Sequence, residues 1–138
     1  MMDSVKEKKI LLMGGTTEGR DLFKPGRPLV YSAATEYGAE LADAVGRDEN
    51  ILSGRMDGDR IRDLLKTGDF AGVIDATHPY ATEVKLNISL ACRETGTPLF
   101  RILRPQTDVP PCCDVTVVKS LGEAARHIER TDGNVLLT

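Results

Sequence analysis

The sequence predicts an α/β fold built on a doubly wound, mostly parallel sheet with helices on both faces. Short apolar runs alternate with segments of helical periodicity, and this alternation is typical of βαβ units. The runs contain few polar residues, which indicates strands buried on both faces, as in a parallel sheet. Because βαβ crossovers are right-handed, a Rossmann-like arrangement is the expected one.

The expected strands share short, largely apolar sequences and are, in chain order, residues 10–13, 29–33, the short 51–52, 73–76, 99–103, 115–118 and 134–137. Between the first two strands, Pro25-Gly26 leaves room for a helix of only about two turns. Further helices are expected at 59–66, 80–95 and 120–130. Their end signals are Asp57 and Gly68 for the first, Pro79 and Gly96 for the second, and a Ser120–Glu123 capping box for the third.

This pattern suggests three parts: a polar tail at 1–9, a Rossmann-like nucleotide-binding domain at 10–132, and at 133–138 the apparent start of a missing second α/β domain. The last part is suggested by the apolar run with which the sequence ends. Residues 106–114, which include Pro110-Pro111, form the one linker-like stretch.

Composition excludes several classes of function. The 138 residues carry a net charge of −3 with no basic stripe, so no nucleic-acid partner is expected. No apolar run approaches the roughly 20 residues of a membrane span, and the N-terminus has no signal-peptide pattern, so no membrane is expected. Cys92, Cys112 and Cys113 form no CxxC pair and fit a reduced, cytoplasmic protein without a metal site.

A glycine-rich turn follows the first strand and precedes a helical segment, the context of a dinucleotide site. Glycines allow the backbone to approach a pyrophosphate, and helix N-termini attract anions. The pattern departs from G-x-G-x-x-G because Thr16 replaces the second glycine, so a tight strand-to-helix turn is an alternative interpretation. Arg20 fits either a phosphate contact or a solvated position. The predicted cofactor-binding residues here are Gly14, Gly15, Thr16, Thr17, Glu18 and Arg20.

Polar residues at the end of the second strand extend this predicted cofactor site. Glu36 lies near the position at which an acidic residue accepts from ribose hydroxyls in NAD sites, although a surface loop residue would also fit there. Ser32 and Thr35 tolerate a 2′-phosphate better than a carboxylate would. The sequence therefore predicts NADPH or NADH and leaves the choice open.

A third motif, Asp75-Ala76-Thr77-His78-Pro79, follows the strand at 73–76. An aspartate in an apolar strand is costly unless it is hydrogen-bonded, and the following loop backbone or a hydroxyl is the expected partner. Thr77 and His78 are expected at the same sheet edge as the glycine turn, where ligands of open α/β sheets bind. His78 is the candidate catalytic residue, for a substrate carboxylate or for proton transfer, although a capping role is also open.

Taken together, these segments resemble the precorrin-6A reductase family, including its cobalt-precorrin-6A branch. The residues that carry the resemblance are 14–20, 34–38, 54–57, 75–82 and 101–105, and the run Asp75-Ala76-Thr77-His78-Pro79-Tyr80-Ala81 is the most specific of them. The resemblance implies an oxidoreductase of cobalamin biosynthesis that reduces one double bond of the precorrin-6A macrocycle with hydride from NAD(P)H. It also implies a tetrapyrrole substrate rich in carboxylates, contacted by Thr77, His78, Tyr80 and Arg101.

The sequence departs from that family in two respects. The family is similar to two-domain proteins with the active site between the halves, and only one half is evident. The first helix is shortened at residues 24–28, where the family continues. The alternative interpretation is therefore a truncated, inactive nucleotide-binding fragment. Another Rossmann-type enzyme with a Tyr-x-x-x-Lys pair is disfavoured, because Tyr31, Tyr37 and Tyr80 lack the lysine.

Overall fold

The computed structural model describes residues 8–44, 50–104, 108 and 114–136. The chain divides into two compact units, Met1–Leu103 and Arg104–Thr138, which are described separately. The expected domain 10–132 spans this division and stays a prediction, as does the expected start of a second domain at 133–138.

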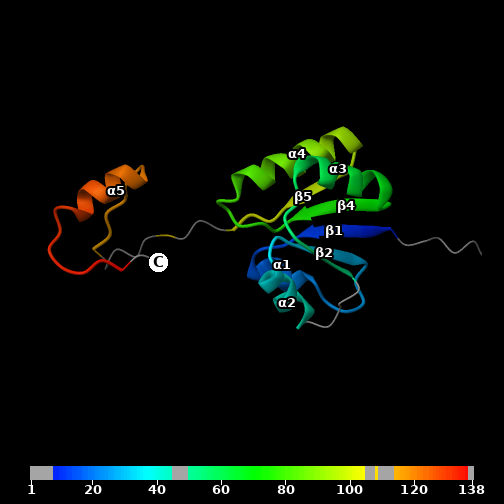
Figure 1. The fold of residues 1–138 in the computed structure, drawn as a ribbon, viewed down its shortest axis with the longest axis horizontal. Coiled ribbons are helices and arrows are strands. Elements are labelled where there is room, and N and C mark those ends of the chain that lie inside the picture. Colours follow the sequence, from blue (N-terminus) through cyan, green and yellow to red (C-terminus); the bar gives the residue numbers. More distant parts are fainter. Residues whose placement is uncertain (1–7, 45–49, 105–107, 109–113, 137–138) are drawn as a thin grey trace, which may run out of the picture. The chain divides into compact units, whose positions relative to one another are not determined.

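The first unit is built on a five-stranded, all-parallel sheet (Figure 1). Its strands are β1 (Lys9–Met13), β2 (Leu29–Ala33), β3 (Ile51–Ser53), β4 (Phe70–Asp75) and β5 (Leu99–Arg101). The order β3-β2-β1-β4-β5 confirms the predicted doubly wound sheet. The chain runs outward from β1 to β3 and then crosses to β4 on the other side of β1. The carboxyl ends of β1 and β4 therefore flank the topological switch point, where ligands bind in such folds.

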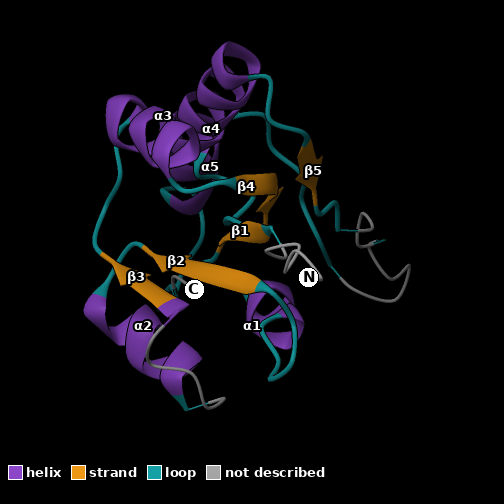
Figure 2. Cartoon of the chain, turned by 90° about the vertical axis from the view of Figure 1, so that its right-hand side faces the viewer, coloured by secondary structure: helices purple, strands orange, loops and turns teal. Residues whose placement is uncertain are grey.

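Helices cover both faces of this sheet (Figure 2). Helices α1 (Thr17–Leu22) and α2 (Glu36–Asp43) lie on one face, and α3 (Gly58–Thr67) and α4 (Thr82–Thr95) lie on the other. The six residues of α1 confirm the short first helix. Helix α2 was not among the expected helices. Its start signal is Thr35, whose Oγ1 accepts from the Gly38 backbone amide at 3.0 Å.

Alternation along the strands divides the core into two clusters, one beneath each helical layer. On the α3–α4 side, Leu11, Val73, Ile61 and Ile88 are fully buried. On the α1–α2 side, Leu12 and Tyr31 are the most buried large residues; the remainder are Phe23, Leu29, Ala33, Ala42 and Ala76. The two packed layers hold the loops at the carboxyl edge in place.

The helix ends agree with the sequence signals except at the start of α4. Asp57 caps α3 by accepting from the Arg60 amide at 2.8 Å, and Gly96 ends α4 with φ of 68°. The expected start of α4 near residue 80, with Pro79 at its first position, is wrong, because α4 begins at Thr82. The Ala81 amide instead donates to the His78 carbonyl at 3.0 Å, so residues 78–81 form a separate turn.

The cap of α2 leads to a stability prediction. Replacing Thr35 by Ala removes the acceptor of the Gly38 amide and should lower the free energy of unfolding by about 1 kcal/mol. Thr35→Ser keeps a hydroxyl at this position and should lie close to the wild type. Urea unfolding of the three proteins checks this expectation, and equal losses in both variants would contradict the cap.

The second unit contains helix α5 (Leu121–Ile128). Half of the predicted capping box is confirmed, since Ser120 Oγ accepts from the Glu123 amide at 3.2 Å. The Glu123 carboxylate accepts at 2.9 Å from the amide of Lys119, which precedes the N-cap residue by one position. The predicted strands at 115–118 and 134–137 are wrong for their described residues, since 115–118 and 134–136 form no strand. Their composition favours strands, but a strand requires a hydrogen-bonded neighbour. Leu137 lies outside the described residues.

Candidate functional site

The turn after β1 and the turn after β4 lie against each other at the carboxyl edge of the sheet. The Thr16 hydroxyl donates to the Ala76 carbonyl at 2.9 Å, and the Ala76 amide donates to the Met13 carbonyl at 2.9 Å. A β-carbon at Gly15 would lie 3.8 Å from the His78 backbone nitrogen. The glycine turn and the histidine turn thus form one surface at the switch point, as the strand order requires.

Two positions of the first turn require glycine, each for a different local reason. Gly15 has φ of 137°, a backbone conformation that residues with a side chain rarely adopt. A β-carbon at Gly19 would lie only 3.0 Å from the Ala76 β-carbon, so this glycine lets α1 pack closely beside β4. The third glycine of the G-x-G-x-x-G pattern is needed for the same close packing of a helix on a strand.

Thr16, which replaces the second glycine of that pattern, holds the turn from within. It is 7% exposed, and its Oγ1 accepts from the Gly19 amide at 3.3 Å while donating to Ala76. The Thr17 hydroxyl is exposed and accepts from Arg20 Nη2 at 3.1 Å. The Thr16 side chain is thus engaged within the protein, whereas Thr17 and Arg20 lie at the surface of the turn.

Three cofactor-binding or ribose-binding residues were predicted at and after the end of β2, and one of them is buried while two are exposed. Ser32 is 4% exposed, and its carbonyl accepts from the Gly14 amide at 2.8 Å. Thr35 and Glu36 are both exposed at the start of α2. Of the three predicted residues, Thr35 and Glu36 therefore present their side chains to solvent, and Ser32 does not.

The buried carboxylate of Asp75 organises the second turn. Its Oδ1 accepts from the Thr77 amide at 3.1 Å and from the Thr77 hydroxyl at 2.6 Å, as expected for an aspartate in an apolar strand. Its Oδ2 accepts from Arg101 Nε at 2.7 Å, and Lys85 Nζ lies 3.6 Å away. Arg101 Nη2 also donates to Ser89 Oγ at 3.1 Å, which joins β4, β5 and α4.

The electrostatics of Asp75 favour its ionised form. Burial of this fully buried group raises its pKa, but the hydrogen bonds from Thr77 and Arg101 and the charge of Lys85 outweigh burial, so the pKa lies below its ordinary value of 3.8. Asp75 is therefore a carboxylate at neutral pH. Arg101, predicted to contact substrate, binds this carboxylate through Nε, and its contact with substrate stays a prediction.

His78 and Tyr80 lie at the surface of the second turn. His78 Nδ1 accepts from the Tyr80 amide at 3.3 Å, and the two rings lie 5.4 Å apart between centroids. With Nδ1 as the acceptor, a neutral ring carries its proton on Nε2. Tyr80 is 87% exposed. Both predicted substrate residues are thus accessible beside the glycine turn.

Sequence reasoning missed Lys85, Ser89 and Tyr31. Lys85 and Ser89 lie one turn apart on α4. The signal that could have found them is that an aspartate in an apolar strand, such as Asp75, needs cationic or hydroxyl partners. The ring of Tyr31 lies against Gly14 of the glycine turn, where a β-carbon would be 2.1 Å from Tyr31 Cζ. In the sequence Tyr31 has the context of an ordinary strand residue, and no signal connected it with the turn.

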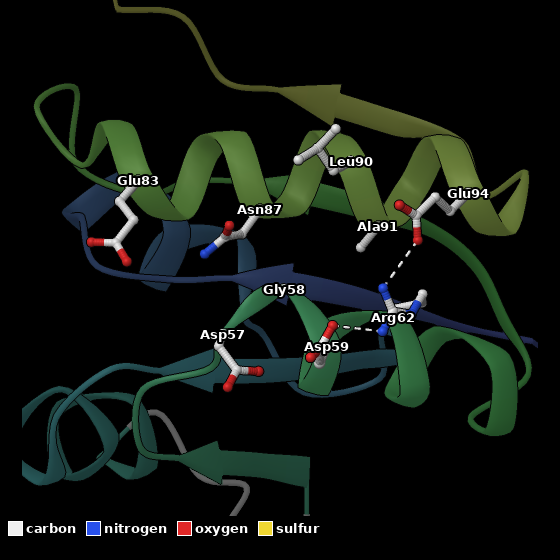
Figure 3. Close-up of a pocket in the computed structure, with 9 residues that line it drawn as sticks. All are labelled: Asp57, Gly58, Asp59, Arg62, Glu83, Asn87, Leu90, Ala91 and Glu94. Atoms are coloured by element: carbon white, nitrogen blue, oxygen red, sulfur yellow. Dashed lines mark hydrogen bonds and ion pairs between the residues drawn. The ribbon is translucent and has the colours of Figure 1, made fainter.

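A separate cavity of about 410 Å³ lies between α3 and α4 and is lined mostly by acidic and polar side chains (Figure 3). Arg62 crosses it, donating to Asp59 at 2.6 Å and to Glu94 at 3.2 Å. No residue of either turn lines this cavity. Among the described residues, no cluster of His, Cys, Asp or Glu is arranged to hold a metal ion. Within the same residues, no helix is long and apolar enough to cross a membrane.

Comparison with known proteins identifies the family of this chain. A family model described as precorrin-6x reductase CbiJ/CobK matches residues 9–138. The chain belongs to this reductase family. It is 34% identical to the cobalt-precorrin-6A reductase of Methanothermobacter thermautotrophicus over 98% of its own length and 46% of the relative. It is 35% identical to the cobalt-precorrin-6A reductase of Salmonella typhimurium over 97% of its own length and 52% of the relative.

The solved structures give the same assignment. A structure described as CobK precorrin-6A reductase matches with a TM-score of 0.73 and 30% identity, covering 86% of this chain and 48% of that one. The chain thus spans about half the length of the reductases it resembles.

Proposed function

We propose that this chain is the nucleotide-binding half of a precorrin-6A reductase of cobalamin biosynthesis, working in the cytoplasm on precorrin-6A or its cobalt form. The observation that carries the proposal is the contact between the two turns through Thr16 and Ala76. It brings the glycine turn and the exposed His78 to one edge of the sheet, so that a cofactor and a substrate can meet there. Relatives of the same family are named as reductases of these two substrates.

The glycine turn fits a dinucleotide through some of its predicted residues. The nearest non-neighbouring atom to a β-carbon at the exposed Gly15 would be 3.8 Å away, so the backbone there can be approached closely. We assign Gly15, Thr17 and Arg20 to the pyrophosphate of NADPH or NADH. Gly14 and Thr16 hold the turn, because the Gly14 amide and the Thr16 hydroxyl already bind protein carbonyls. Glu18 and Ser32 are assigned no direct contact.

The choice of cofactor depends on Thr35 and Glu36 at the end of β2. The exposed Thr35 hydroxyl suits a 2′-phosphate, and Glu36 suits free ribose hydroxyls. When bound, the nicotinamide cofactor supplies the hydride. We assign to His78 Nε2, which is free to donate when Nδ1 accepts from the Tyr80 amide, a hydrogen bond to a substrate carboxylate or the delivery of a proton. Thr77 and Tyr80 are assigned to the substrate as well.

Titration of the chain with NADPH and NADH, followed by nicotinamide fluorescence, tests the cofactor site. We expect micromolar affinity for at least one of them. Arg20→Gln should raise Kd about tenfold, because a charge-assisted bond to phosphate is lost. Arg27→Gln is the matched control, since Arg27 precedes β2 at the opposite edge of the sheet and should leave Kd unchanged.

Two results separate the proposed function from its alternatives. Failure to bind either cofactor would refute the site. Binding without turnover of precorrin-6A or its cobalt form would favour the nucleotide-binding fragment over a complete enzyme.

A further inference from the structure

The ring of Tyr31 occupies the space beside Gly14. Tyr31 lies in β2 opposite Leu12 of β1 and is 1% exposed. A β-carbon at Gly14 would lie 2.1 Å from Tyr31 Cζ and 2.2 Å from its hydroxyl oxygen, distances that no real side chain tolerates. Gly14 is not among the described glycines with positive φ. Its lack of a side chain is therefore required by the tyrosine and not by its backbone conformation.

The hydroxyl of the same tyrosine lies at the glycine turn, since its oxygen would be 2.2 Å from a β-carbon at Gly14. Burial raises the pKa of the Tyr31 phenol, while a hydrogen bond with the Gly15 backbone and the nearby charge of Arg20 partly offset this effect. Because its pKa is raised, the phenol is neutral at physiological pH. The Phe23 ring, 5.1 Å from that of Tyr31 between centroids, supports it within the core.

We propose that Tyr31 is a positioning residue for the cofactor turn: its ring excludes any side chain at position 14, and its hydroxyl orients the Gly15 backbone. The link to the nucleotide rests on the proposed function. The steric coupling of Tyr31 with Gly14 does not. Gly14 thus accommodates the protein's own aromatic ring, while Gly15 is the glycine that we assign to the ligand.

A double-mutant cycle on thermal unfolding tests the steric coupling without cofactor. Gly14→Ala should lower the unfolding midpoint by at least about 5 °C, because the new methyl group meets the end of the tyrosine ring. Tyr31→Leu removes the contacting atoms. Adding Gly14→Ala to Tyr31→Leu should therefore lower the midpoint by less than half as much as it does in the wild type. Additive losses would overturn the coupling.

Tyr31→Phe tests the positioning role, because it keeps the ring and removes the hydroxyl. The Gly15 amide should exchange its hydrogen faster, and Kd for the cofactor should rise about threefold to tenfold. Ile88→Val is the matched control: Ile88 is equally buried but lies in the core on the other face of the sheet. It should lower the midpoint comparably and change neither the Gly15 exchange nor Kd.

The outcomes separate this proposal from the proposed function. If the wild type binds no cofactor, the proposed function fails, while Gly15 exchange and the double-mutant cycle still decide the role of Tyr31. If the wild type binds and Tyr31→Phe changes neither the exchange nor Kd, the positioning role is wrong.

Discussion

Replacing Asp75 by Asn is expected to lower the free energy of unfolding at pH 7 by about 3 kcal/mol, because it leaves two cationic side chains without their shared carboxylate. Asp75 is fully buried, with Arg101 Nε at 2.7 Å and Lys85 Nζ at 3.6 Å from its Oδ2. Asparagine has nearly the same shape, so the loss reports charge and not packing. Chemical denaturation of both proteins measures it.

The same substitution should alter the dependence of stability on pH. The pKa of folded Asp75 lies below its ordinary value of 3.8, so the folded state binds a proton less readily than the unfolded chain does. Its contribution is therefore complete above about pH 5 and is lost as pH falls through the folded pKa. The stability difference between wild type and Asp75→Asn should be constant from pH 5 to 8 and should shrink below about pH 4.

Asp59 provides the matched control for Asp75. It also pairs with an arginine, but its side chain is 80% exposed, and exposed pairs contribute little. Asp59→Asn should change the free energy of unfolding by less than about 1 kcal/mol. Equal losses for Asp75→Asn and Asp59→Asn would contradict the role of the buried carboxylate.

Replacing Gly15 by Ala is expected to affect both stability and cofactor affinity. Its φ of 137° should cost a residue with a β-carbon about 1–3 kcal/mol. The added methyl group would also stand where the backbone is to approach the pyrophosphate, so Kd should rise at least about tenfold. Fluorescence titration and denaturation of one preparation measure both effects.

Gly26 separates these two effects, because it also has positive φ, at 86°, but lies between α1 and β2 at the far edge of the sheet. Gly26→Ala should be destabilised to a similar degree and should bind the cofactor normally. If both variants lose affinity equally, strain alone explains the result and Gly15 has no special place in the site.

Local signals in the sequence were sufficient for much of this fold. Apolar runs such as 10–13 and 29–33 predicted parallel strands, and Asp57 and Gly96 marked helix ends, because caps depend on one or two neighbouring residues. Helix α2 was missed because the Thr35–Gly38 segment was interpreted either as part of the cofactor site or as a surface loop. The strand predicted at 115–118 failed because composition does not show whether a neighbouring strand exists.

The candidate site was predicted in outline and not in its contacts. The expectation that Asp75 would find a partner in its own loop is confirmed, since Thr77 is adjacent in sequence. The bonds of Asp75 to Arg101 and of Arg101 to Ser89 join distant segments, and no local pattern shows them. The contact of Tyr31 with Gly14 depends in the same way on the register of β1 with β2.

Mapping of backbone amide shifts during titration with NADPH or NADH tests the central claim most directly. A single dinucleotide surface at the carboxyl edge predicts that the largest changes fall on both turns together, at Gly15–Arg20 and at Thr77–His78. Changes confined to the α3–α4 cavity around Arg62, or changes in one turn without the other, would contradict it.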